Sequence, residues 1–368
     1  MINIPFLKKV RLPGFSLGFL SGKPNRVAGI DIGMYSTKVV QLRYESERAI
    51  LESYGELLNE RYTKGAAGYG SGFLRHSDND IATLLKDIVA ESNITAKEAV
   101  FSLPASSSFT TTISLPRLTK KEVASAIPYE ARKYVPIPLA EVVLDWDILE
   151  TEERETTNVL LVAVPKELIE KFKRIANETH LSVRALEVET FSVIRSLIGH
   201  DPIPTAIINF GHLTTTLSIV DMAKLRVSHS FERGSNQLTQ ALERGLGVNK
   251  ERAEQIKRDI GLGERIEEKQ FTSIMLPLLE AQLSEVNRLI DGYNRKAGRK
   301  IQKVNVTGGG SQLSGIIELA ATHFGIEVTR GNPFARVVSP AFMQPILREI
   351  GPSFAVAVGL ALHEITRR

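Results

Sequence analysis

The chain has 368 residues, of which 43% are hydrophobic and 24% are charged, and its formal net charge is +4. This length predicts two or three domains with a sizeable core, and the absence of cysteine excludes disulfides and thiolate metal sites. Acids and bases are interspersed, and no apolar run reaches the ~20 residues of a membrane span, so the composition favours neither nucleic acid nor the bilayer interior as a partner.

Residues 1–25 differ from the rest of the chain. Apolar residues are mixed there with Lys8, Lys9 and Arg11, and no acid occurs. The uninterrupted apolar region and the small-residue cleavage site of a signal peptide are missing. Because prolines and glycines interrupt the segment, we expect a flexible extension; the alternative is a short interfacial segment attracted to anionic lipid or to a partner.

The stretch that follows organises the chain. Val27 to Ile32 predicts a buried strand and Lys38 to Leu42 a second one. Four residues there can serve a phosphate site: Asp31, Gly33, Ser36 and Lys38. Gly33 at the bend lets backbone N–H groups and Ser36 approach a phosphate, and Asp31 could reach a phosphate-bound Mg²⁺ through its water shell. An ordinary hairpin is the alternative.

The next elements are a strand at 49–58, a glycine-rich connection at 61–79, an amphipathic helix at 81–91 and a strand at 99–103. No Gly-Lys-Ser/Thr follows the glycine-rich connection, so it is not a P-loop. We expect it to be a loop.

Residues 104–185 predict a compact inserted subdomain of two helices and about three strands. Thr119 caps the first helix with Glu122 in the capping-box position, and Pro128 predicts a kink in that helix. Strands at 142–149 and 159–164 flank a polar turn, and an amphipathic helix ends the insert.

Two later stretches repeat the combination of strand and glycine turn. In the segment from Ala206 to Val220, a turn at Gly211 is followed by hydroxyls that include Thr214, and then by a second strand. The segment from Lys303 to Ile317 is a strand that runs into Gly308, Gly309 and Gly310, and then a helix capped by a serine. Such a turn lets a base and ribose lie against bare backbone and offers a helix N-terminus to an anion.

In this order and at domain-scale spacing, the three stretches resemble the two phosphate motifs and the adenosine motif of the actin-like ATPase superfamily, which includes actin, sugar kinases, FtsA and MreB. The resemblance implies an α/β actin-like (ribonuclease H-like) two-domain fold with an FtsA-type inserted α/β subdomain, and ATP with Mg²⁺ as cofactors. The implied division is residues 1–25 as extension, 26–103, 186–204 and 346–368 as first domain, 104–185 as insert, and 205–345 as second domain with a nucleoside-binding subdomain at 231–300.

The resemblance also implies site residues. The catalytic positions are Asp31, which is also the metal position, Glu189 and Asn209, and the phosphate positions are Gly33, Ser36, Lys38, Gly211 and Thr214. The nucleoside positions are Gly234, Asn236, Glu254, Lys257, Gly308, Gly309 and Gly310. Glu189 corresponds to an acid or amide near the attacking water, although an acid at a helix N-terminus is also favoured by the dipole. The superfamily normally has an aspartate where this chain has Asn209, so we expect slow or absent ATP hydrolysis.

Glu130 to Leu139, preceded by Leu115-Pro-Arg-Leu-Thr119, resembles the PilM family of the type IV pilus assembly platform, as does the closing stretch Phe354 to Leu362. This resemblance implies a cytoplasmic, ATP-binding scaffold, peripheral at the inner membrane, that binds the cytoplasmic tail of a PilN-like bitopic membrane protein. Pilus motor ATPases and further copies of the chain are other implied partners. The alternatives are an FtsA-like cell-division anchor and a small-molecule kinase of the same superfamily.

For the partner tail we expect a groove between the insert and the first domain. The strands at 110–115 and 142–149 leave an edge to which an extended peptide can add a strand. Tyr129 and Tyr134 are suited to clamp such a peptide. The alternative is that both tyrosines only cover the small core of the insert.

Overall fold

The computed structural model describes residues 25–45, 48–62, 77–149, 156–263 and 265–363. The expectations for residues 1–24, for most of the glycine-rich connection and for the polar turn at 150–155 lie outside these ranges. The chain divides into two compact units: unit 1 comprises residues 1–196, 335–339 and 356–368, and unit 2 comprises residues 197–334 and 340–355.

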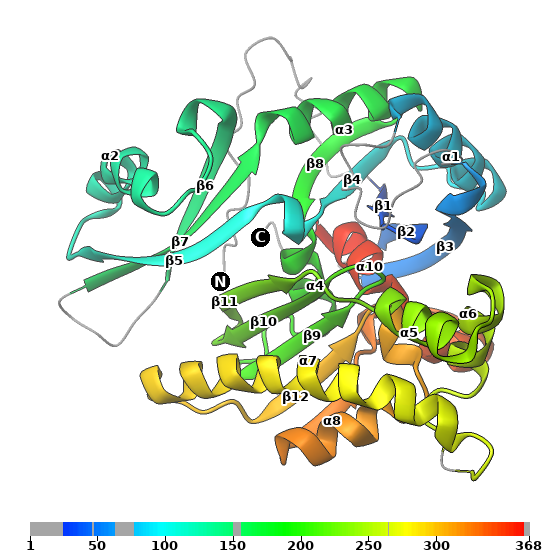
Figure 1. Cartoon of the computed structure of the whole chain (residues 1–368). Coiled ribbons are helices and arrows are strands. Elements are labelled where there is room, and N and C mark those ends of the chain that lie inside the picture. The colour runs from blue at the N-terminus through cyan, green and yellow to red at the C-terminus, as the bar shows by residue number, and fades with distance from the viewer. Residues whose placement is uncertain (1–24, 46–47, 63–76, 150–155, 264, 364–368) are drawn as a thin grey trace. The chain divides into compact units, whose positions relative to one another are not determined.

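Unit 1 contains a five-stranded sheet in the order β3-β2-β1-β4-β8 (Figure 1). Its strands are β1 (Arg26–Ile32), β2 (Ser36–Glu45), β3 (Arg48–Leu58), β4 (Glu98–Leu103) and β8 (Ser182–Val188). β1, β2 and β3 are antiparallel, whereas β1, β4 and β8 run parallel. Every residue of β1 after Arg26 is buried, as expected for a central strand covered on both faces.

The helices that pack on this sheet are α1 (Asp78–Glu91), α3 (Lys166–Glu178), α4 (Glu189–Leu197) and α10 (Ala355–Ala361). α10 approaches its neighbours very closely. An added Cβ at Gly29 of β1 would lie 2.1 Å from the carbonyl oxygen of Ala357, and one at Gly359 would lie 1.9 Å from that of Ser192. Because both obstacles are backbone atoms, only glycine permits this packing.

The inserted sheet has the order β5-β7-β6 and is antiparallel throughout. Its elements are β5 (Phe109–Pro116), α2 (Lys120–Glu130), β6 (Val142–Leu149) and β7 (Thr156–Pro165). Figure 1 shows α2 beside the sheet. Its residues Val123 and Ile127 are buried in one cluster with Ile113 and Leu161 of the sheet. Thr119 and Glu122 form the expected capping box. Pro128 lies in the last turn of α2, where the chain continues as a 3₁₀ turn.

Helix α3 lies within the range expected for the insert, yet it packs on α1 (Figure 1). The Nζ atom of Lys171 lies 2.6 Å from Oδ1 of Asp78, and the ring of Phe172 meets that of Phe101 on β4 with centroids 6.2 Å apart. We therefore propose that the inserted subdomain ends with β7 rather than at residue 185.

Unit 2 contains a second five-stranded sheet, in the order β11-β10-β9-β12-β13. Its strands are β9 (Thr205–Phe210), β10 (Thr215–Asp221), β11 (Lys224–Phe231), β12 (Lys303–Thr307) and β13 (Glu327–Arg330). As in unit 1, a three-stranded antiparallel meander continues into two parallel strands. The two sheets therefore have one topology, and each begins with a strand that ends in a glycine turn.

The helices of unit 2 are α5 (Asn236–Leu246), α6 (Lys250–Asp259), α7 (Lys269–Lys296), α8 (Ile316–Phe324) and α9 (Gln344–Ile350). Figure 1 shows α7 running along the sheet, and its buried residues Val286 and Ile290 pack against Ile208 and Leu217. Their helical spacing explains why this long helix buries a single stripe. No helix within the described ranges is both long enough and apolar enough to cross a membrane.

Short 3₁₀ turns complete the fold: η1 (Asn59–Arg61), η3 (Ala105–Ser107), η4 (Ala131–Lys133), η5 (Leu139–Glu141), η6 (Gly309–Gln312), η7 (Pro333–Arg336), η8 (Ala341–Met343) and η9 (Gly351–Phe354). Residues 335–339 join unit 1, where the N–H of Leu51 donates to the carbonyl of Val338 over 2.9 Å. Residues 340–355 join unit 2, where the N–H of Gly308 donates to the carbonyl of Pro352 over 2.9 Å. We therefore propose that the return to the first domain begins near residue 356 rather than at 346.

Candidate functional site

The first expected phosphate motif is the turn between β1 and β2 in unit 1. A Cβ on Gly33 would lie 2.8 Å from the carbonyl oxygen of Ser36, so the turn is too tight for a side chain there. The buried Asn59 fixes this turn, since its Nδ2 donates to the carbonyl of Gly33 over 2.7 Å. Its Oδ1 accepts from the hydroxyl of Thr37 over 3.0 Å. Sequence reasoning missed Asn59, because only the return of β3 to the hairpin brings it near.

Asp31 lies at the end of β1 with 9% of its surface exposed. The hydroxyl of Ser102, on the parallel strand β4, donates to its Oδ1 over 2.8 Å. Burial raises the pKa of Asp31 above its ordinary value, whereas the cation of Lys38 and the bond from Ser102 oppose the rise. A carboxylate held in one orientation in this way can bind a water of a hydrated Mg²⁺.

Glu189 is the first residue of α4, and it lies close enough to Asp31 for the Asp31 charge to affect its pKa. Its Oε1 accepts from the N–H of Ala105 over 3.0 Å. Burial, followed by the negative charge of Asp31, raises the pKa of Glu189 to about 7. Such a carboxyl can accept or release a proton near neutral pH. Unit 1 thus brings together two of the three expected catalytic residues.

Ser36 and Lys38, the expected phosphate donors, point toward one another. The Nζ of Lys38 donates to Oγ of Ser36 over 2.7 Å, and Ser36 Oγ donates to Oε1 of Glu56 over 2.5 Å. Lys38 Nζ also lies 3.2 Å from that Glu56 oxygen. Glu56 is on β3, and sequence reasoning missed it because its place depends on the strand register.

The second expected phosphate motif is the turn between β9 and β10 in unit 2. The N–H of Gly211 donates to the carbonyl of Thr214 over 3.0 Å, which closes the turn. A Cβ added to Gly308 would lie 2.6 Å from Oδ1 of Asn209. The structure therefore brings Asn209 and the triple-glycine turn side by side, through the parallel pairing of β9 with β12.

In the triple-glycine turn the three residues have different roles. Gly308 has φ +82° and Gly310 lies so close to Phe210 that a Cβ would be 2.6 Å from its ring. Gly309 is exposed, and an added Cβ there would have no neighbour within 4 Å among the residues that the structure describes. Bare backbone is thus presented at Gly309, as a nucleoside would require. The expected serine-capped helix is wrong: the turn continues as η6, Ser311 Oγ donates to the carbonyl of Gly308 over 2.7 Å, and α8 begins only at Ile316.

Gly234 and Asn236 pack directly behind the second phosphate turn. A Cβ on Gly234 would lie 2.4 Å from the carbonyl oxygen of His212, which accepts from the N–H of Asn236 over 2.9 Å. Asn236 begins α5 and is buried, and its Oδ1 has no hydrogen-bond partner among the described residues. Burial and the cation of Lys257 lower the pKa of His212 to about 4, so the imidazole of the turn is neutral at pH 7.

Glu254 and Lys257 share one face of α6, three residues apart. The Nζ of Lys257 donates to Oε2 of Glu254 over 2.6 Å and to Oγ1 of Thr239 on α5 over 2.9 Å. Burial would raise the pKa of Glu254, but the Lys257 cation and bonds from Lys257, Arg258 and Thr239 outweigh it and lower this pKa to about 2. The structure brings the pair together, and its contact with a nucleoside stays a prediction.

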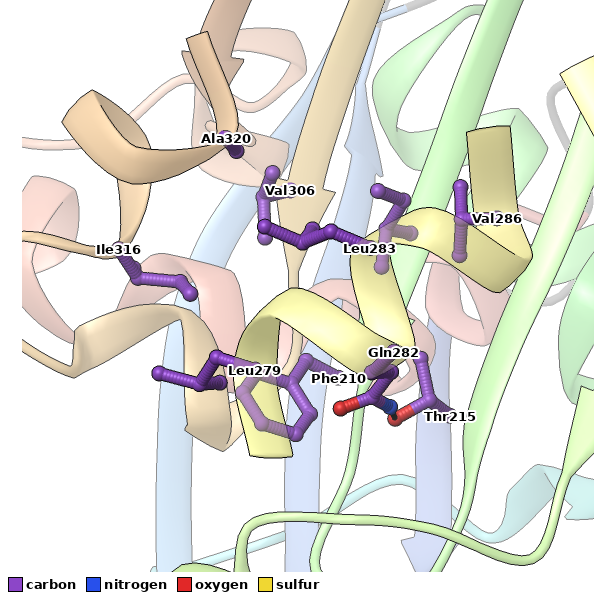
Figure 2. Close-up of a pocket in the computed structure, with 10 residues that line it drawn as sticks. Phe210, Thr215, Leu279, Gln282, Leu283, Val286, Val306, Ile316 and Ala320 are labelled. Carbon is purple, nitrogen blue, oxygen red and sulfur yellow. Dashed lines mark hydrogen bonds between the residues drawn. The ribbon is translucent and has the colours of Figure 1, made fainter. Parts of the chain in front are cut away.

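A small cavity of about 20 Å³ lies beneath the second phosphate motif (Figure 2). Apolar side chains form most of its lining, and the amide of Gln282 contacts the hydroxyl of Thr215 at one side. Its volume corresponds to about one water molecule, so it is not a nucleotide pocket.

Within the described ranges, no group of three or more histidine, aspartate or glutamate side chains could hold a metal ion directly.

The model of the family described as "Type IV pilus assembly protein PilM" matches residues 29–365. The cell division protein FtsA of Agrobacterium fabrum (strain C58) is 25% identical over 228 residues, which are 55% of this chain and 50% of FtsA. The chain thus spans about half the length of the curated relatives it matches.

Several solved structures are similar over most of the chain. One, titled "PilM-PilN type IV pilus biogenesis complex", has a TM-score of 0.79 and 23% identity and covers 92% of this chain and 98% of the other. MreB 5 of Spiroplasma citri bound to AMPPNP has a TM-score of 0.55 and 13% identity, over 94% and 97% of the two chains. These likenesses confirm the expected actin-like α/β fold.

Proposed function

The chain belongs to the PilM family of type IV pilus assembly proteins, and from that premise we propose that it is an ATP-binding scaffold of the pilus platform that holds the cytoplasmic tail of a PilN-like membrane protein. The observation that supports nucleotide binding best is the triple-glycine turn, where Gly308 lies against Asn209 of the second phosphate motif and the next residue, Gly309, leaves bare backbone. The solved relative that is a complex of PilM with PilN supports the partner. Recruitment through this partner would make the protein peripheral at the inner membrane.

Each unit carries its own share of the proposed nucleotide-binding residues. In unit 1, Ser36 and Lys38 would donate to phosphate oxygens, and Asp31 would orient a water of the hydrated Mg²⁺. In unit 2, the buried, unpartnered Oδ1 of Asn236 and the Glu254–Lys257 pair would meet the nucleoside. Mg²⁺, when bound, would neutralise phosphate charge.

Binding without fast hydrolysis follows from Asn209. An amide at this position keeps a hydrogen-bonding oxygen but lacks the negative charge that favours a hydrated divalent ion. Glu189, with its pKa near 7, can still accept a proton from water. We propose slow or absent turnover with nucleotide binding retained, because phosphoryl transfer depends on positioning and charge.

Equilibrium unfolding in the presence of ATP and Mg²⁺ tests the nucleotide part. A ligand at about 100 times its Kd should stabilise the folded chain by about 2.7 kcal/mol. The Asp31→Ala variant should lose Mg²⁺ dependence more than it loses affinity for adenosine. If the nucleotide-free wild type shows no stabilisation by ATP and Mg²⁺, the nucleotide part of the proposal is wrong.

The inserted subdomain is the proposed site for the partner tail. β5 and β6 are the edge strands of its sheet, so each can accept an added strand. Tyr129 is 70% exposed and Tyr134 is 43% exposed, which argues against the alternative that both only cover the small core. Arg132 lies over the ring of Tyr129, 5.9 Å from its centroid, which holds the ring at the surface.

Titration of a PilN-like N-terminal peptide tests the partner part. Because Phe109 pairs with Ala163, the chain enters and leaves the inserted sheet at neighbouring points, so a short linker can replace residues 109–165 while α3 stays on α1. Binding should disappear with this deletion. Tyr129→Ala should weaken binding, whereas Phe342→Ala, a matched change at an 83% exposed aromatic of unit 2, should not. Equal binding by the folded deletion protein would place the site elsewhere.

An FtsA-like anchor remains the second candidate, because the curated relative FtsA matches about half of the chain. Affinity capture of membrane partners distinguishes the two functions. A PilN-like bitopic protein is the expected partner, and a cell-division filament protein in its place would favour the alternative.

A further inference from the structure

A carboxylate already occupies the two side-chain donors of the first phosphate motif. Ser36 Oγ donates to Oε1 of Glu56, and Lys38 Nζ lies within 3.2 Å of the same oxygen. Ser36 and Lys38 are 2% and 9% exposed, so both donors are buried, whereas the carboxylate that they contact lies at the surface. A carboxylate oxygen accepts the same charge-assisted bonds as a phosphate oxygen. Glu56 therefore competes with phosphate for both donors.

The sheet register places this carboxylate. Lys38 and Glu56 are directly opposite in the antiparallel pair of β2 and β3, and Ser36 lies on the same face as Lys38 because it is two residues away. The Glu56 side chain is 38% exposed. It can therefore turn toward solvent when a ligand takes over the two donors, without disturbing the buried sheet.

Acidic side chains lie close to the cation of this motif. The charges of Lys38 and Glu56 both act on the pKa of Asp31, and the charge of Asp31 acts on the pKa of Glu189. The ammonium of Lys38 is thus shared between the carboxyl groups of Asp31 and Glu56. A triphosphate without a metal ion would add its full charge to this set, whereas a divalent cation bound to the phosphates would offset it.

We propose that Glu56 is a specificity-determining residue that makes the phosphate motif discriminate between metal-bound and metal-free nucleotide. The Glu56 carboxylate stays bonded to Ser36 and Lys38 until a nucleotide whose negative charge is reduced by a bound metal ion displaces it. This inference rests on the proposed function, since it assigns a selectivity to the same nucleotide site.

The test compares the Kd for ATP in excess Mg²⁺ with that in EDTA, by calorimetry on the full chain. Glu56→Gln keeps the shape and removes the charge, and it should tighten binding of metal-free ATP by about tenfold, the scale expected for one contact charge at a partly exposed site. Binding of ATP with Mg²⁺ should tighten by less than about threefold, because the cation already offsets the phosphate charge. Glu60→Gln, the same change at an exposed residue of η1, should leave both constants unchanged.

A ratio of the two constants that is the same in wild type and Glu56→Gln would overturn the inference, as would weaker binding of metal-free ATP by the variant. Glu56→Ala is a second variant in which the same change of ratio is expected. If none of the proteins binds ATP in either buffer while all remain folded by circular dichroism, the proposed nucleotide binding is wrong and this inference is wrong with it. An unchanged ratio with measurable binding overturns the role of Glu56 alone.

Discussion

Glu189→Gln should change how the stability of the chain depends on pH. In the folded chain, burial and the neighbouring charge of Asp31 raise the pKa of Glu189 from 4.5 to about 7, and only the bond from Ala105 opposes the rise. The folded state therefore binds this proton more tightly than the unfolded state. The resulting stabilisation is complete below pH 4.5 and is lost as the pH rises through 7.

The size of the effect follows from the two pKa values. A rise of the Glu189 pKa from 4.5 in the unfolded chain to about 7 in the folded chain lowers the free energy of unfolding by about 3 kcal/mol between acid and neutral pH. Glu189 keeps partial solvent exposure even though protein atoms crowd its carboxyl, so this figure is an upper bound. Glutamine cannot ionise, so the variant should gain stability relative to wild type across this range.

Urea unfolding of both proteins at a series of pH values between 4.5 and 8 measures the difference directly. Far-ultraviolet circular dichroism is the appropriate signal, because the single tryptophan, Trp146, reports only on the inserted sheet. Titration of groups such as His212 and Glu254 is common to both proteins and cancels. Asp31→Asn should lower the pKa of Glu189 and shrink the effect. Parallel stability profiles for wild type and Glu189→Gln over this range would refute the reasoning.

Three further changes test separate parts of the structure. Asn209→Asp should raise the rate of Mg²⁺-dependent ATP hydrolysis by restoring a charge that orients the hydrated metal, and an unchanged rate in a phosphate-release assay would count against this role. Gly309→Ala should weaken ATP binding without changing the melting temperature. Gly298→Ala should change neither quantity, although its Cβ would likewise have open space within the described part of the chain. Met222→Asn should stabilise the chain by about 0.5–1 kcal/mol in urea unfolding. Met222 has φ +54° in the turn between β10 and β11, and asparagine tolerates this conformation better than methionine. A loss of stability would contradict this explanation.

The sequence by itself determined the local elements of the protein. Apolar runs that end in glycine turns predicted β1 and β9 together with their hairpins, and the Thr119–Glu122 pair predicted the start of α2. These features depend on residues close together in the chain, where side-chain period, turn chemistry and helix capping decide the outcome. The order of the motifs along the chain then predicted the actin-like fold, which the comparisons confirmed.

Only the tertiary structure decided which side chains meet. Glu56 reaches Lys38 because β3 pairs with β2 in one register, and a shift of a single residue would turn it to the other face. α3 packs on α1 and the main sheet of unit 1 rather than in the insert, because Lys171 pairs with Asp78 of α1 and Phe172 contacts Phe101 of β4. The pKa of Glu189 near 7 depends on burial and on Asp31, more than a hundred residues earlier in the chain. Contacts of this kind depend on strand register and on packing between distant segments, which no local pattern of residues encodes.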